Sequence, residues 1–197
     1  MFERIRYLIK LSHAHRIARR YFVTNGFDGV LAMLGLLMGF RVTEPSASLT
    51  VMIGACGGTA VALFMSGITS AYISESAEKE HELHELEESM LRSLERSAHA
   101  EAAKRMPWLI AMVNGLSPLV FALLIILPMF MAREGLWPFL SPLDSAIAMA
   151  ALLSFCLGVF LGRLSGSFWL WSGLRALSIA VMTAAIIVLI NRLPGIR

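Results

Sequence analysis

Five long apolar runs constrain the fold of this chain more than any other feature. They cover approximately residues 21–40, 48–73, 108–131, 144–163 and 168–190. Each is close to the roughly 20 residues that a helix needs to cross about 30 Å of hydrocarbon. Only 16% of the residues are charged, whereas soluble domains carry about a quarter. We therefore predict an all-α integral membrane protein with five transmembrane helices, organised as a single membrane domain over residues 1–197.

A strongly acidic segment separates the second run from the third. Residues 75–101 hold nine of the fourteen carboxylates and three of the five histidines. Because such a segment is excluded from hydrocarbon, residues 74–106 are predicted to form an aqueous insert between two spans. Leu83, Leu86 and Met90 recur at helical spacing, which predicts an amphipathic helix that continues from the second span. We expect Pro107 to end the insert and to begin the third span.

The distribution of Lys and Arg predicts the orientation in the membrane. Residues 1–20 hold six of them and the insert holds five, whereas the 41–48 and 132–143 loops hold one each. Since cytoplasmic segments carry the excess of Lys and Arg, we place the N-terminus and the insert in the cytoplasm. This topology explains the net charge of +3, so no nucleic-acid partner is implied. A plasma membrane and an organelle membrane fit equally well.

The basic N-terminus also has an apolar side. Phe2, Ile5, Leu8 and Ile9 recur at helical spacing among Arg and Lys residues. This pattern predicts an N-terminal amphipathic helix that lies on the anionic cytoplasmic leaflet.

One side of the insert, which we call the acidic face, combines carboxylates with an imidazole. Its members, at spacings of three or four residues, are Glu75, Glu78, His81, Glu82, Glu85 and Glu88. Like charges at this spacing destabilise an isolated helix by about 0.2–0.5 kcal/mol per pair, and a bound cation would remove that penalty. Carboxylate and imidazole suit Fe, Mn and Zn ions. We predict that the acidic face binds divalent metal; the alternative is an ordinary solvated face.

Asp28 is the one acidic residue deep within an apolar run. It lies eight residues beyond Arg20, about 12 Å along a helix, where an ionised carboxylate costs about 2.5–3.5 kcal/mol. We expect no Lys or Arg at a matching depth. We therefore assign Asp28, with Asn25 and Asn114, to a polar path through the bundle. The alternative is a structural Asp28, protonated or hydrogen-bonded to Asn114 or to a hydroxyl.

Small residues form a further stripe in the second run. Gly54, Gly58, Ala62, Ser66 and Ser70 recur every four residues. Such a stripe allows two helix backbones to approach closely, inside one chain or between two.

Taken together, this layout resembles the vacuolar iron transporter family. The resemblance is carried by Asn25-Gly26-Phe27-Asp28-Gly29, by Ala71-Tyr72-Ile73-Ser74 before the acidic helix, and by the Gly115–Pro118 element. It implies a homodimer that moves Fe(II), and often Mn(II), out of the cytoplasm against protons, with Asp28 in the translocation path and insert glutamates collecting metal. Family members commonly carry Met and Glu at the positions of Gly67 and Ala71.

Three hypotheses follow. The leading one is a homodimeric, proton-coupled transporter whose substrate is a divalent metal ion, Fe2+ with Mn2+ or Zn2+ as further substrates. The second, favoured by Gly67 and Ala71, is a membrane-anchored metal-binding or sensor protein that does not transport. The third, remote one is a di-metal membrane enzyme, because Glu78 and His81 form a Glu-x-x-His pair that a dimer would supply twice. We assign no catalytic residues and expect no enzyme.

Overall fold

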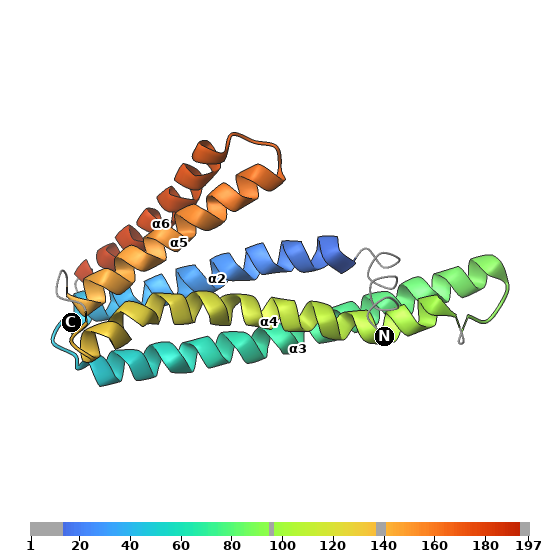
Figure 1. Cartoon of the computed structure of the whole chain (residues 1–197), viewed down its shortest axis with the longest axis horizontal. Helices are drawn as coiled ribbons and strands as arrows, with labels where there is room; N and C mark the ends of the chain where they lie inside the picture. Colours follow the sequence, from blue (N-terminus) through green and yellow to red (C-terminus); the bar gives the residue numbers. More distant parts are fainter. Residues whose placement is uncertain (1–13, 95–96, 137–140, 194–197) are drawn as a thin grey trace. The chain divides into compact units, whose positions relative to one another are not determined.

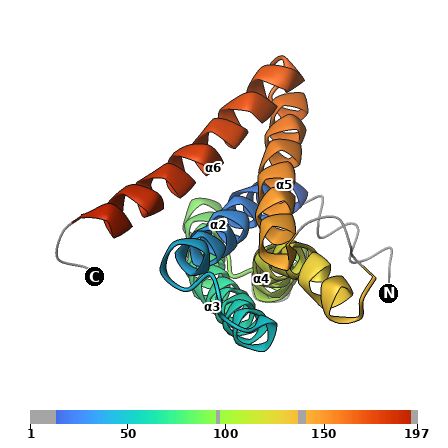
Figure 2. The same cartoon turned by 90° about the vertical axis from the view of Figure 1, so that its left-hand side faces the viewer.

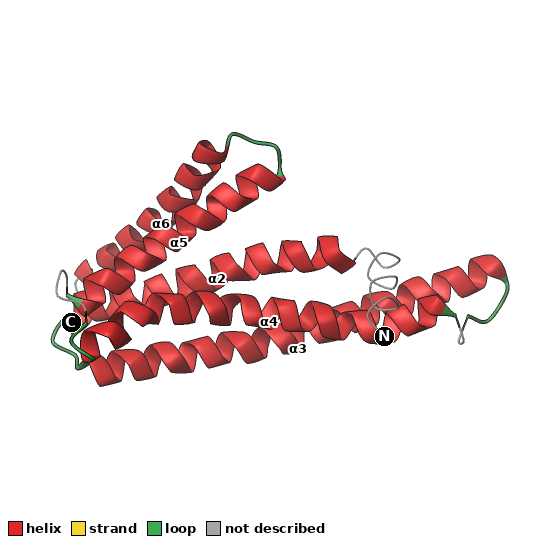
Figure 3. Ribbon diagram, viewed as in Figure 1, coloured by secondary structure: helices red, strands yellow, loops and turns green. Residues whose placement is uncertain are grey.

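The computed structural model describes residues 14–94, 97–136 and 141–193, and within them every regular element is a helix (Figures 1 and 3). The helices are α2 (Ala14–Thr43), α3 (Leu49–Met90), α4 (Ala98–Arg133), α5 (Pro142–Leu164) and α6 (Trp169–Arg192). All five of these helices are long and apolar enough to cross a membrane. The predicted all-helical class with five such helices is thus confirmed. The predicted amphipathic helix around Phe2–Ile9 lies outside the described residues.

Helices α3 and α4 extend well beyond their apolar runs. Helix α3 continues for 42 residues, from Leu49 to Met90, since no Pro or Gly interrupts it after Gly67. Helix α4 begins at Ala98, nine residues before Pro107, where the third span is predicted to begin. This proline is fully buried, and the turns on both sides of it remain helical. The one hydrogen bond that its missing N–H removes therefore does not end the helix.

The residues group into two compact units. Of the described residues, the first unit combines those up to Asn25 with those of Phe64–Ser117, and the second combines Gly26–Leu63 with those from Pro118 onward. In the first unit, Ala102, Met106 and Ile110 of α4 form a buried cluster against which Ile17 and Tyr21 of α2 pack. The spacing of four residues along α4 places this stripe on one side of the helix. Apolar periodicity thus fixes the contact between α2 and α4 in this unit.

Glycines allow close helix contacts in each unit. In the first unit, a Cβ added at Gly67 would lie 2.9 Å from Gly115 Cα. In the second unit, a Cβ at Gly29 would lie 2.7 Å from Pro118 Cα. Real Cβ atoms essentially never approach below 3.0 Å, so these positions require glycine in the present packing. Gly29, next to Asp28 in the Gly26-Phe27-Asp28-Gly29 element, and Gly115 therefore each hold a close helix contact within their own unit.

In the second unit, α5 starts at a capped end and packs on α6. The Ser141 side chain accepts a hydrogen bond from the Asp144 backbone N–H, and Pro142 follows the cap, which is a favourable helix start. Asp144 Oδ1 also lies 3.3 Å from Arg41 Nη2 of α2. A Cβ at Gly158 would lie 2.6 Å from the Ser172 carbonyl oxygen. Figure 2 shows α5 and α6 meeting near their connecting turn and diverging toward the other end of α6.

Candidate functional site

A polar cluster ties three helices together in the first unit. Asn25 of α2 donates a side-chain hydrogen bond to Asn114 Oδ1 of α4. Asn114 Nδ2 in turn donates to the carbonyl oxygen of Gly67 on α3, at 2.7 Å. Asn114 is only 2% exposed. Two of the three residues assigned to the polar path therefore meet, and both polar groups of the Asn114 side chain have protein partners.

The third residue of that path, Asp28, belongs to the second unit. Its side chain is exposed on α2, within a helix segment apolar enough to span a membrane. Among the residues that the structure describes, the Asp28 carboxylate forms no ion pair and no hydrogen bond. Within residues 14–94, 97–136 and 141–193, Asp28 is therefore a carboxylate without a partner.

Arg175 is a functional candidate that the sequence reasoning missed. It lies six residues after Trp169, the first residue of α6, which is about 9 Å along the helix. Its side chain is exposed, and it lines a cavity of about 590 Å³ together with Phe27 and Leu31 of α2. A basic side chain therefore lines the same cavity as Phe27, the chain neighbour of Asp28, whereas the sequence reasoning considered no Lys or Arg within the fifth apolar run. The sequence did contain a signal for Arg175, because it is the one charged residue in the apolar run 168–190. An ionisable residue inside a span indicates a functional position, which is also the reason Asp28 was selected.

The structure divides the acidic face into paired and exposed residues. Glu75 is 6% exposed, and its carboxylate accepts a hydrogen bond from the hydroxyl of Tyr21. Lys79 is equally buried, and its Nζ atom lies 2.6 Å from Glu82 Oε2. Helical spacing within α3 could not show that Glu75 is covered, because the covering residue, Tyr21, comes from α2. Glu75 and Glu82 are thus already engaged within the protein.

The exposed part of the face carries two imidazole–carboxylate pairs. His81 Nε2 lies 3.4 Å from Glu85 Oε1, and His84 Nε2 lies 3.4 Å from Glu88 Oε1. Glu78 is exposed as well. The predicted metal-binding set did not include His84. Its spacing of four residues to Glu88 is the same as that of His81 to Glu85, so the sequence already contained the signal for this second pair. In the described part of the chain, no three His, Cys, Asp or Glu residues are placed to share one ion, so each pair supplies two ligands.

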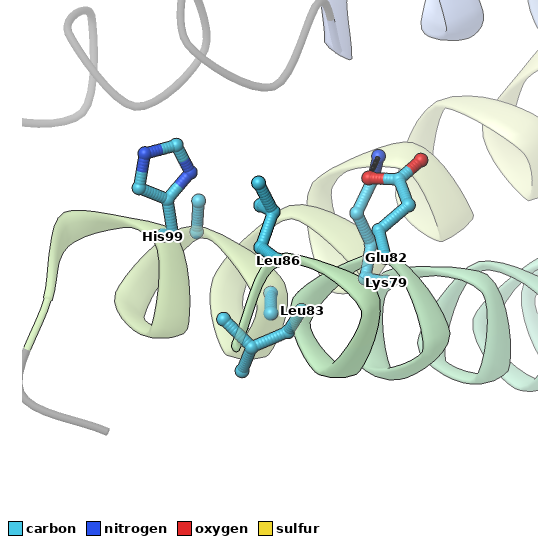
Figure 4. A pocket seen from close by; sticks show the side chains of 7 residues that line it. Lys79, Glu82, Leu83, Leu86 and His99 are labelled. Carbon is cyan, nitrogen blue, oxygen red and sulfur yellow. Dashed lines mark hydrogen bonds and ion pairs between the residues drawn. The ribbon is translucent and has the colours of Figure 1, made fainter. Parts of the chain in front are cut away.

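His99 comes from the opposite helix and stands apart from these pairs. A small cavity of about 60 Å³ between α3 and α4 is lined by Lys79, Glu82, Leu86 and His99, among others. Figure 4 shows His99 at one end and the Lys79–Glu82 pair at the other, with Leu86 between them. The cavity therefore does not bring His99 together with Glu82 as a ligand pair.

The described part of the chain is all-helical, and its five long apolar helices indicate that it belongs to the class of membrane proteins. Comparison with protein-family models finds no match. No solved structure matches the chain. An uncharacterized protein of Methanocaldococcus jannaschii is 29% identical over 176 residues, which cover 88% of each chain. The similarity thus extends over most of both chains, and the name of that relative assigns no activity.

Proposed function

We propose that this chain is a divalent-metal transporter that exports Fe2+ or Mn2+ from the cytoplasm in exchange for protons. The observation that carries the proposal is Asp28, an exposed carboxylate without a partner in the described chain and within an apolar helix. A carboxylate that faced lipid would cost about 2.5–3.5 kcal/mol on insertion scales. Intramembrane ionisable residues of this kind characteristically line paths for ions or protons.

Carboxylate chemistry supplies the coupling. A carboxylate must be ionised to bind a divalent cation, so protonation releases the metal. If Asp28 alternates between metal and proton, one residue links two opposite fluxes.

The acidic face supports capture of metal before transport. His81 with Glu85, and His84 with Glu88, each present a nitrogen and a carboxylate oxygen on the exposed side of α3. Divalent transition metals accept such mixed ligand sets. Two ligands hold an ion weakly, which suits a residue set that collects metal and passes it on.

A second copy of the chain would complete these ligand sets. The small-residue stripe on α3, formed by Gly54, Gly58, Ala62, Ser66 and Ser70, is exposed along its length. Such stripes permit close helix–helix contact in a membrane. We therefore propose a homodimer, in agreement with the resemblance to vacuolar iron transporters, with the insert and the N-terminus in the cytoplasm.

One observation favours a second function, metal binding without transport. The resembled family commonly carries Met at the position of Gly67, where a Cβ here would lie 2.9 Å from Gly115 Cα. Ala71, at the family's Glu position, is 2% exposed. Neither position offers a ligand. A membrane-anchored metal sensor would need only the exposed face.

Reconstitution into vesicles distinguishes these functions. Purified full-length protein in proteoliposomes with an imposed pH gradient is supplied with Fe(II) or Mn(II), while internal dyes report metal and pH. Protein-free vesicles and Mg(II) are the controls. A transporter gives metal uptake with proton counter-flux. A sensor binds metal in detergent without flux, and a protein that does neither would refute both proposals.

A further inference from the structure

A cavity in the second unit has a polar end and an apolar wall. It measures about 590 Å³ and lies between α2 and the hairpin of α5 and α6. Phe27, Leu31 and Leu161 contribute apolar surface, whereas Ser165, Ser167 and Arg175 contribute polar groups. All of these helices are apolar enough to span a membrane. The cavity therefore has the chemistry of a site for an amphiphile.

The charge at the polar end is positive and uncompensated. Residues 145–197 contain no Asp or Glu. Asp28 follows Phe27 on α2, but in the described chain neither its carboxylate nor any other forms an ion pair with Arg175. A guanidinium offers five N–H donors and cannot be deprotonated in proteins. In an apolar environment, Arg175 thus calls for an anionic partner, and the described residues supply none.

The polar end also lies where lipid headgroups are found. Ser165 Oγ and Ser167 Oγ, 2.5 Å apart, belong to the turn between α5 and α6. The adjoining Trp169 and Trp171 are exposed, as is typical of aromatic anchors at a membrane–water interface. The long Arg175 side chain can extend along the apolar surface and keep its charge near this level.

From this geometry we infer that the cavity binds one anionic phospholipid per chain. The phosphate is held by Arg175 and the serine hydroxyls, and an acyl chain lies against Phe27, Leu31 and Leu161. Guanidinium and phosphate match in charge and in hydrogen-bond geometry, and basic pockets between transmembrane helices bind anionic headgroups. The assignment requires only that the helices lie in a membrane, so it is independent of metal transport.

Competition between two lipids tests the site. The full-length protein in detergent receives equal amounts of phosphatidylglycerol and phosphatidylcholine with identical acyl chains, and native mass spectrometry counts the lipid bound per chain. We expect one phosphatidylglycerol per chain, and Arg175→Gln should weaken its binding about tenfold, as for loss of a charged hydrogen bond. Arg192→Gln is the matched control, because Arg192 is exposed at the other end of α6.

A second variant and a competing anion distinguish a bound lipid from a free phosphate ion in the cavity. Leu31→Trp fills the apolar wall while keeping Arg175, so it should reduce retention of phosphatidylglycerol; this variant decides the matter if Arg175→Gln does not fold. Inorganic phosphate should not displace the lipid, and displacement would identify a free-anion site instead. The inference would be overturned if both lipids were retained equally, or if Arg175→Gln and Leu31→Trp both retained phosphatidylglycerol as the wild type does. A dimer whose cavity excludes lipid would overturn it as well.

Discussion

Asn114 Nδ2 donates a 2.7 Å hydrogen bond to the Gly67 carbonyl oxygen at a tight contact between α3 and α4. A Cβ on Gly67 would lie 2.9 Å from Gly115 Cα and 3.2 Å from the Asn114 carbonyl oxygen. The hydrogen bond and the absence of a side chain at Gly67 thus both depend on the short distance between α3 and α4 at this point. Position 67 contributes to helix packing in this protein, and it has no room for a metal-binding side chain.

Substitution at Gly67 should therefore destabilise the fold. Gly67→Ala forces backbone atoms apart, and overpacking of this kind costs about 1–3 kcal/mol. The matched control is Gly54→Ala on the same helix, where nothing lies within 4 Å of an added Cβ. Thermal unfolding of both variants in detergent, followed by tryptophan fluorescence, measures the difference. Equal melting temperatures for Gly67→Ala and the wild type would show that the contact is not tight.

The Asn25–Asn114 hydrogen bond should appear as a coupling energy. Interhelical hydrogen bonds in membranes average about 0.6 kcal/mol and reach about 1.7 kcal/mol in double-mutant cycles. We expect Asn25→Ala and Asn114→Ala to destabilise the protein separately, and the double variant to lose less than their sum. Reversible unfolding in mixed micelles gives the four free energies. Strict additivity would mean that the two amides do not interact.

Substitutions of Glu75 and Glu85 should have different effects, because Glu75 has a structural role and Glu85 is proposed to bind metal. Glu75 is buried and accepts a hydrogen bond from Tyr21, so Glu75→Ala should lower the melting temperature and leave metal binding unchanged. Glu85 is exposed beside His81, so Glu85→Ala should weaken Mn(II) binding without changing stability. Calorimetric titration and thermal unfolding provide the two readouts. If Glu75→Ala weakens metal binding as much as Glu85→Ala, the division of the face is incorrect.

The sequence predicts the helices well because it determines them locally. Five apolar runs of membrane-spanning length give five helices, and the absence of Pro or Gly after Gly67 lets α3 continue to Met90. Pro107 is predicted to begin the third span, but it does not begin the helix, since α4 already starts at Ala98. Burial of its neighbours Met106 and Ile110 keeps α4 helical through it.

The candidate site is less predictable because it depends on which side of each helix is covered. Asn25 and Asn114 are selected as polar residues in apolar runs, but their contact depends on the packing of α2 against α4. Glu75 shares its helical spacing with exposed glutamates, and only Tyr21 distinguishes it. Arg175 escapes notice when basic residues are counted only in the loops, since that count concerns topology and ignores the spans.

Metal flux through Asp28→Asn proteoliposomes tests the proposed mechanism most directly. The substitution keeps the shape of the side chain and removes its titratable charge, so the protein should fold normally. Asp144→Asn is the matched control, because Asp144 lies in the first turn of α5 and pairs with Arg41. We predict that Asp28→Asn abolishes Fe(II) or Mn(II) uptake and proton counter-flux, while Asp144→Asn retains both. Wild-type flux through well-folded Asp28→Asn protein would contradict a transport role for this carboxylate.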